Sequence, residues 1–117
     1  MKSMDSGLGP SGKLTLQVIA MPKDTNPHGD IFAGWLVSQM DLAAATAAGQ
    51  ISKGRATTVA IDRVEFLSPV SVGDQVSCYA ELIDTGRSSM KIRIEVFVTD
   101  ARASQTRKVT EGVFIYV

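Results

Sequence analysis

The chain has few of the residues that build metal sites or disulfides. It holds one cysteine, Cys78, and one histidine, His28, among 117 residues. A single cysteine can form neither an intrachain disulfide nor a cysteine-rich metal site. A single histidine excludes zinc sites made of histidine clusters. The scarcity of cysteine also fits a reducing compartment, so we expect a cytoplasmic protein with no metal.

Neither sign of charge is in excess. Lys and Arg number 12, Asp and Glu number 12, and the formal net charge is +0. The basic residues are spread along the chain, and no dense block resembles the footprint of a nucleic-acid-binding protein. Hydrophobic residues make up 44% of the chain, enough for the core of one domain. A domain of this size leaves much surface exposed, so self-association would help it.

No segment has the pattern of a signal peptide or a membrane span. The N-terminus is rich in Gly and Ser and has no apolar run. We expect residues 1–13 to be a flexible tail or a remnant of cloning, and residues 14–117 to form a single domain. Residues 31–52 have the length of a membrane helix, but Asp41 near their middle is strongly disfavoured in lipid. A buried helix, with no membrane contact, is the better interpretation.

The periodicity predicts one helix and five strands. The helix is expected over residues 31–48, with Asp30 as its N-cap and Gly49 near its C-terminus. After it the apolar period changes to two, which is typical of strands. The expected strands cover residues 14–20, 57–67, 76–82, 90–98 and 109–117, the last four as a meander. This is an α+β layer of one helix on an antiparallel sheet, whose open edges favour dimerisation edge to edge.

Asp41 is the only charged residue between Ile31 and Ser52. One turn to either side of it, the helix carries Val37 and Ala45 and no Lys or Arg. An unpaired carboxylate is costly to bury, so its presence needs a reason. One reason is acid–base chemistry beside a cleft. The other is a structural aspartate whose partners the fold supplies, and the residues alone leave both interpretations open.

Several separated motifs resemble the hotdog acyl-CoA thioesterases, and among them the short bacterial acyl-CoA hydrolases of the YciA type. They are residues 26–35 (NPHGDIFAGW) followed by 39–41 (QMD), 20–22 (AMP), 70–74 (VSVGD) and 86–89 (GRSS). The resemblance covers residues 14–117. It implies the hotdog fold, a dimer with a continuous sheet, and a hexamer built as a trimer of dimers. It also implies hydrolysis of acyl-CoA to a carboxylic acid and coenzyme A, with no cofactor.

The resemblance also implies a role for each matching residue. Asp41 matches the catalytic carboxylate, which acts as general base on water or as nucleophile. Asn26 matches a loop amide that orients water or polarises the thioester carbonyl, and that reaches the carboxylate of a different subunit. Ala33 and Gly34 stand where the family usually has two glycines. Backbone N–H groups at a helix start suit a developing oxyanion.

The predicted hairpin Arg87-Ser88-Ser89 matches a region that the family places near the phosphates of coenzyme A. Arginine and backbone donors suit phosphate, although an exposed turn arginine often has no role. Two other functions stay open. One is a hotdog module that binds acyl-CoA without hydrolysing it. The other is a dehydratase, which needs a catalytic histidine, and His28 lies in the wrong motif for that role.

Overall fold

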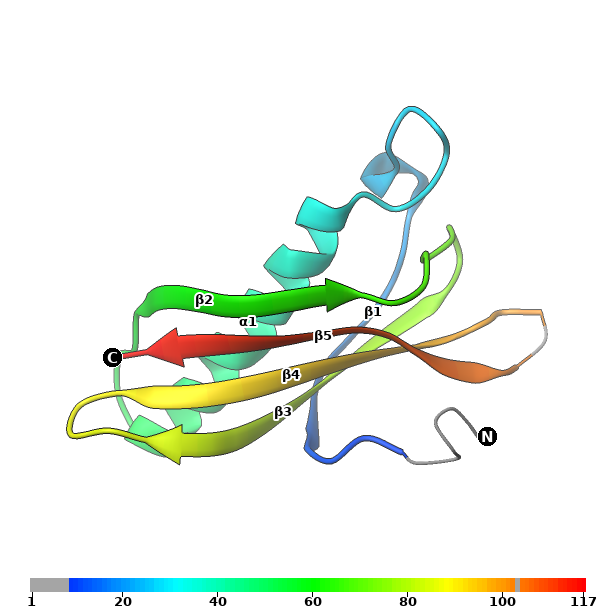
Figure 1. The fold of residues 1–117 in the computed structure, drawn as a ribbon. Helices are drawn as coiled ribbons and strands as arrows, with labels where there is room; N and C mark the ends of the chain where they lie inside the picture. The colour runs from blue at the N-terminus through cyan, green and yellow to red at the C-terminus, as the bar shows by residue number, and fades with distance from the viewer. Residues whose placement is uncertain (1–8, 103) are drawn as a thin grey trace.

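The computed structural model describes residues 9–102 and 104–117, so residues 1–8 of the predicted tail lie outside the described part. One helix, α1 (Ala33–Ser52), lies across one face of a five-stranded antiparallel sheet (Figure 1). The strands are β1 (Lys13–Ile19), β2 (Thr58–Phe66), β3 (Gln75–Thr85), β4 (Met90–Thr99) and β5 (Thr106–Tyr116), and a 3₁₀ turn, η1 (Pro22–Asp24), precedes the helix. The predicted α+β class and hotdog architecture are confirmed.

The core lies between the helix and the inner face of the sheet. The helix buries one stripe, Leu36, Met40, Ala43, Ala44 and Ala48. These positions recur three, four and seven residues apart, which is the spacing of one helix face. The inner face of the sheet contributes alternate residues of its central strands to this core, among them Val76, Cys78, Ile92, Ile94, Val96, Phe114 and Tyr116. The small alanines let the helix lie close to the sheet.

The predicted meander of four strands is wrong for β2. The strand order is β1-β3-β4-β5-β2, so β2 pairs with β5 at one edge and β1 pairs with β3 at the other. Only β3, β4 and β5 follow one another as neighbours. The loop between β2 and β3 therefore passes the ends of β5 and β4, from the β2 edge to the strand beside β1. Alternation within a strand specifies which residues face the core, but it does not specify the neighbouring strand.

The helix begins and ends later than predicted. It starts at Ala33, with Phe32 rather than Asp30 as its N-cap, and it continues through Gly49 to Ser52. The left-handed residue that closes it is Lys53, with φ 57°, whose N–H donates to the carbonyl of Gly49. Glycine is tolerated inside a helix at modest cost, so Gly49 did not mark the end.

The first described residues contact the outer face of the sheet. The N–H of Ser11 donates to Oε1 of Glu95 at 2.8 Å, and Nζ of Lys108 donates to Oε2 at 2.8 Å. Burial by itself raises the pKa of Glu95, but these donors outweigh it and lower the pKa overall. Lys13 already belongs to β1.

One buried hydroxyl on β5 offers a test of this core. Thr110 is fully buried, and Oγ1 has no hydrogen-bond partner among the described residues. Thr110→Val removes an unsatisfied polar group at nearly constant shape, so we expect the free energy of unfolding to rise by about 1 kcal/mol. Urea denaturation measures it, with Thr99→Val, at an exposed hydroxyl pair, as a near-neutral control. A loss of stability in Thr110→Val would show that the hydroxyl has a partner.

Candidate active site

The loop before the helix is closed by its own backbone. Thr25 and Ile31 form an isolated antiparallel bridge. Inside it the N–H of Asn26 donates to the carbonyl of Asp30 at 2.7 Å, and the N–H of Gly29 donates back to the carbonyl of Asn26 at 2.9 Å. Gly29 has φ 89°, a left-handed conformation that suits glycine. The loop thus holds its shape within a single chain.

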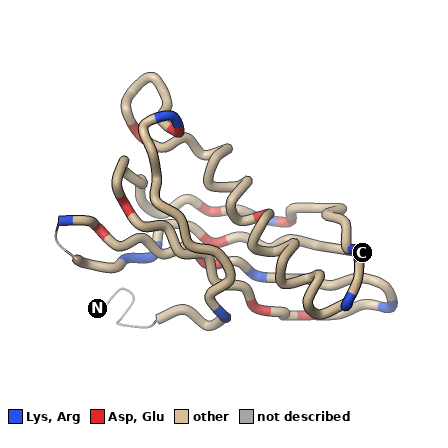
Figure 2. Tube along the Cα trace, turned by 180° about the vertical axis from the view of Figure 1, so that it is seen from behind, with Lys and Arg blue, Asp and Glu red and all other residues tan. Residues whose placement is uncertain are grey.

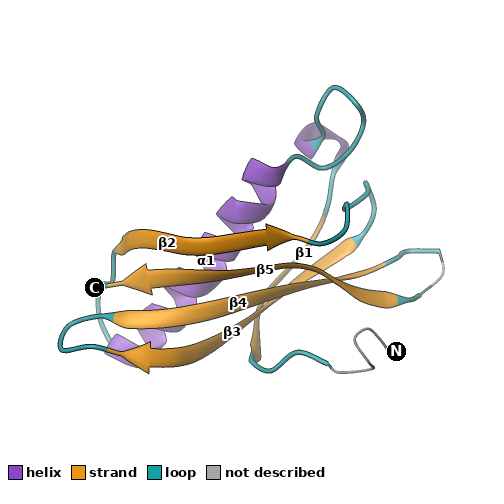
Figure 3. Cartoon of the chain, viewed as in Figure 1, coloured by secondary structure: helices purple, strands orange, loops and turns teal. Residues whose placement is uncertain are grey.

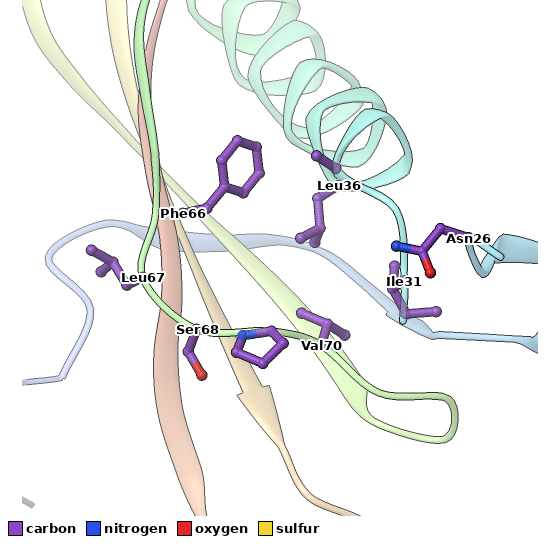
Figure 4. Close-up of a pocket in the computed structure, with 9 residues that line it drawn as sticks. Asn26, Ile31, Leu36, Phe66, Leu67, Ser68 and Val70 are labelled. Carbon is purple, nitrogen blue, oxygen red and sulfur yellow. The ribbon is translucent and has the colours of Figure 1, made fainter. Parts of the chain in front are cut away.

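The side chain of Asn26 is oriented by two backbone donors. Oδ1 accepts the N–H of His28 at 2.9 Å and the N–H of Asp30 at 3.1 Å. Because both partners are donors, the atom that faces them is the oxygen, and the amide nitrogen is left to point away. In Figure 4 this nitrogen points into the space between the helix start and the chain after β2. Asn26 therefore presents a fixed N–H donor.

A cavity of about 400 Å³ lies beside this donor. Two segments line it, the loop with the helix start on one side and residues 66–70 on the other (Figure 4), and it is open to solvent. Apart from Asn26 and Ser68, its lining is apolar: Ile31, Ala33, Leu36, Phe66, Leu67, Pro69 and Val70. A largely apolar hollow with few polar groups is typical of a small-molecule site.

The start of α1 supplies further donors at the same place. Phe32 makes no capping hydrogen bond with its side chain. The N–H of Trp35 donates to the carbonyl of Phe32, but the N–H groups of Ala33 and Gly34 meet no acceptor within the described residues. First-turn N–H groups carry partial positive charge and lack helix partners. Ala33 and Gly34 are also exposed, so a ligand can reach them.

Asp41 lies on the same helix, farther along. Apart from it the helix carries no charged residue, and Figure 2 shows the helix mostly in the tan of uncharged residues. Its Oδ1 accepts the hydroxyl of Thr58 at 2.8 Å and the hydroxyl of Tyr116. Within the described residues Oδ2 accepts no hydrogen bond, and no Lys or Arg pairs with the carboxylate. Oδ1 is therefore fixed by two hydrogen bonds, and Oδ2 is available to accept a proton or a hydrogen bond from a ligand.

The two hydroxyls that hold Asp41 were not predicted from the sequence. Thr58 and Tyr116 face each other across the β2–β5 ladder, so neighbouring strands present both groups at one level. Tyr116 is fully buried. Burial first, and then the hydrogen bond to Asp41, raise the pKa of its phenol, which therefore stays protonated and remains a donor. The sequence did carry one signal for this contact. Tyr116 lies two residues after Phe114, so strand alternation places both side chains on the same buried face, and a buried tyrosine hydroxyl needs a hydrogen-bond partner.

The hairpin with Arg87 lies at the other end of the sheet. Its turn is closed by the N–H of Gly86, which donates to the carbonyl of Ser89 at 2.9 Å. Arg87 and Ser88 are exposed, and no acidic residue of the described ranges pairs with Arg87. Figure 3 shows this β3–β4 turn opposite the end that holds the Asn26 loop and the β2–β3 loop. Within one chain, this hairpin and the cavity beside Asn26 do not meet.

Four other distinctive side chains lie in the core or on the surface. Met40 and Cys78 are fully buried in the core, and Trp35 packs against it. Burial raises the pKa of the Cys78 thiol to about 12, so it is no nucleophile near neutral pH. His28 is exposed and contributes its backbone N–H to the loop.

The described residues contain neither a cluster of metal ligands nor a membrane-spanning helix. No group of three or more His, Cys, Asp or Glu side chains in that part of the chain could hold a metal ion. No helix there is both long and apolar enough to cross a membrane.

The chain is similar to proteins of one family. A family model described as thioesterase superfamily matches residues 28–104. The acyl-CoA thioester hydrolase YciA of Salmonella typhimurium is 48% identical over 120 residues, which cover 100% of this chain and 89% of the relative.

Solved structures agree with this similarity. The hexameric thioesterase of Yersinia pestis is 53% identical, with a TM-score of 0.88, covering 92% of this chain and 88% of its own. A hexameric broad-specificity acyl-coenzyme A thioesterase, solved with one aspartate replaced by alanine, is 43% identical, with a TM-score of 0.91. The match covers 94% of this chain and 82% of that chain. The chain therefore belongs to the thioesterase superfamily, and within it to the acyl-CoA thioester hydrolases of the YciA type.

Proposed function

We propose that the chain hydrolyses acyl-CoA thioesters to a free carboxylic acid and coenzyme A. The observation that carries the proposal is the pairing of full-length similarity to YciA with a carboxylate held by one oxygen only. The chemistry needs no metal, since a carboxylate and fixed N–H donors supply the base and the electrostatic stabilisation. The scarcity of cysteine fits a cytoplasmic location, which we propose with it.

In the proposed mechanism Asp41 acts as a general base. Oδ2 takes a proton from water while the water oxygen attacks the thioester carbonyl. The N–H groups of Ala33 and Gly34 stabilise the oxyanion, and the amide of Asn26 polarises the carbonyl or holds the water. The tetrahedral intermediate then expels the thiolate of coenzyme A, which takes up the proton.

We further propose that each site is completed by two subunits, with Asn26 from one and Asp41 from the other. Support comes from the β2 edge, which is unpaired within the chain and exposes large apolar side chains. Val59, Ile61, Phe66 and Leu67 are 54%, 45%, 49% and 58% exposed. An edge of this kind is a template for pairing with another strand. Pairing of two β2 edges gives a continuous sheet, and the relatives described as hexameric favour three such dimers.

A thiol-release screen over short, medium, long and branched acyl-CoAs tests the function. We expect turnover of at least one class. Tight binding of coenzyme A with no release of thiol from any of them would overturn hydrolysis and favour the non-catalytic binding module. Sedimentation of the same protein tests the assembly, and a monomer at assay concentration would contradict the two-subunit site.

We propose that Arg87, with Ser88 and Ser89, contacts the phosphates of coenzyme A. Arg87→Ala then raises KM for acyl-CoA by about 10-fold, the value of one lost charge-assisted hydrogen bond, and leaves kcat unchanged. The same variant leaves KM unchanged for an acyl-N-acetylcysteamine thioester, which has no phosphate. Arg102→Ala, in the exposed β4–β5 turn, is the matched control. An equal effect of Arg87→Ala on both substrates would exclude phosphate contact.

A further inference from the structure

Tyr116 touches Asp41 at two points. Its hydroxyl donates to Oδ1 of the carboxylate, and it lies 2.9 Å from the backbone carbonyl oxygen of the same residue. The carbonyl oxygen has a second lone pair beyond the one used in the helix, so the hydroxyl has two acceptors available. The phenol thereby links the side chain of Asp41 to its own backbone.

We propose that Tyr116 is a positioning residue for the hydrolysis. By holding Oδ1 against the helix backbone, it fixes the rotamer of Asp41 and leaves Oδ2 as the oxygen that takes the proton from water. The inference rests on the proposed function, since positioning matters only if Asp41 is the base.

The surroundings suit this role. Tyr116 is fully buried between helix and sheet, so packing fixes the ring on the inner face of β5. The hydroxyl of Thr58 approaches the same carboxylate oxygen from the adjacent strand. A carboxylate on a side chain with two rotatable bonds would otherwise sample several orientations, and a displacement of about 1 Å can cost about 100-fold in rate.

Tyr116→Phe removes the hydroxyl and keeps the ring. We expect kcat to fall by about 10- to 100-fold, with KM and the thermal midpoint nearly unchanged. Tyr79→Phe is the matched control, because Tyr79 is the other tyrosine and packs against Phe97 on β4, away from Asp41. A folded Tyr116→Phe protein with wild-type kcat would overturn the inference. So would a fall in kcat that only follows the loss of folded protein.

A second measurement does not depend on how Tyr116→Phe folds. In Tyr79→Phe, Tyr116 is the only tyrosine, so the infrared C–O stretching band of labelled tyrosine reports on its hydroxyl alone. Adding Asp41→Asn replaces a charged acceptor by a neutral one, and we expect the band to shift. An unmoved band would show that the hydroxyl does not bind the carboxylate in solution.

The same assays separate this inference from the proposed function. If the wild-type protein releases no thiol from any acyl-CoA, the function itself fails. If the wild type is active and Asp41→Asn is not, but Tyr116→Phe is fully active, only the positioning role fails.

Discussion

Replacing Asp41 by asparagine lowers kcat for acyl-CoA hydrolysis by roughly 10²- to 10⁴-fold, the usual contribution of a general base. Asparagine has the same shape, and its carbonyl oxygen can still accept the hydroxyls of Thr58 and Tyr116. It cannot take a proton from water. The fold and the thermal midpoint are therefore expected to remain unchanged. Thiol release measures the fall in kcat, and circular dichroism measures the fold and the thermal midpoint.

A matched control for this variant is Asp84→Asn at the exposed end of β3. The carbonyl oxygen of asparagine can keep the hydrogen bond that Asp84 accepts from the N–H of Thr85. It repeats the chemical change away from the helix and should retain wild-type kcat. Near-normal turnover by Asp41→Asn would rule out the mechanism and return Asp41 to the structural interpretation. A single turnover in ¹⁸O-water separates the two catalytic roles, since label entering Asp41 would identify a nucleophile rather than a base.

Asn26→Asp is expected to lower kcat by about 10²- to 10³-fold, the cost of losing one donor at a developing oxyanion. Aspartate keeps the oxygen that accepts the N–H groups of His28 and Asp30, so the loop should retain its shape. It loses the amide N–H₂ and places negative charge beside the reacting carbonyl. Asn26→Ala is less informative because it also removes the acceptor that shapes the loop.

His28→Gln is the control on the same loop, since the loop uses only the backbone N–H of this residue. We expect wild-type activity from it, whereas a dehydratase that relied on its imidazole would lose activity. If Asn26→Asp retains wild-type kcat with an intact fold, the amide of Asn26 has no role in the chemistry.

Mixing the two inactive variants tests the shared site directly. In a dimer of one Asp41→Asn chain and one Asn26→Asp chain, one site carries both substitutions and the other carries neither. Activity should therefore return when the subunits exchange. If each chain holds a complete site of its own, every site in the mixture is damaged and no activity returns.

The sequence predicted the helix and the five strands, and it singled out Asp41 as a candidate site residue, because each leaves a local mark. Alternation along β4 and the absence of other charges in the helix are visible within a few residues. The place of β2 beside β5 left no such mark, because it joins segments that are far apart in the chain. Asp30 was an incorrect N-cap because its backbone closes the Asn26 loop instead. Tyr116 was missed because its contact with Asp41 depends on strand register and on the height of the helix above the sheet.

The burial of Cys78 gives the native protein a practical property. With its only thiol enclosed beneath the helix, the folded chain adds no background when a thiol-reactive dye counts released coenzyme A. Unfolding of β3 uncovers that sulfur and makes it titrate in the ordinary range. Denaturant therefore turns the same dye into a natural reporter of sheet opening, without any engineered label.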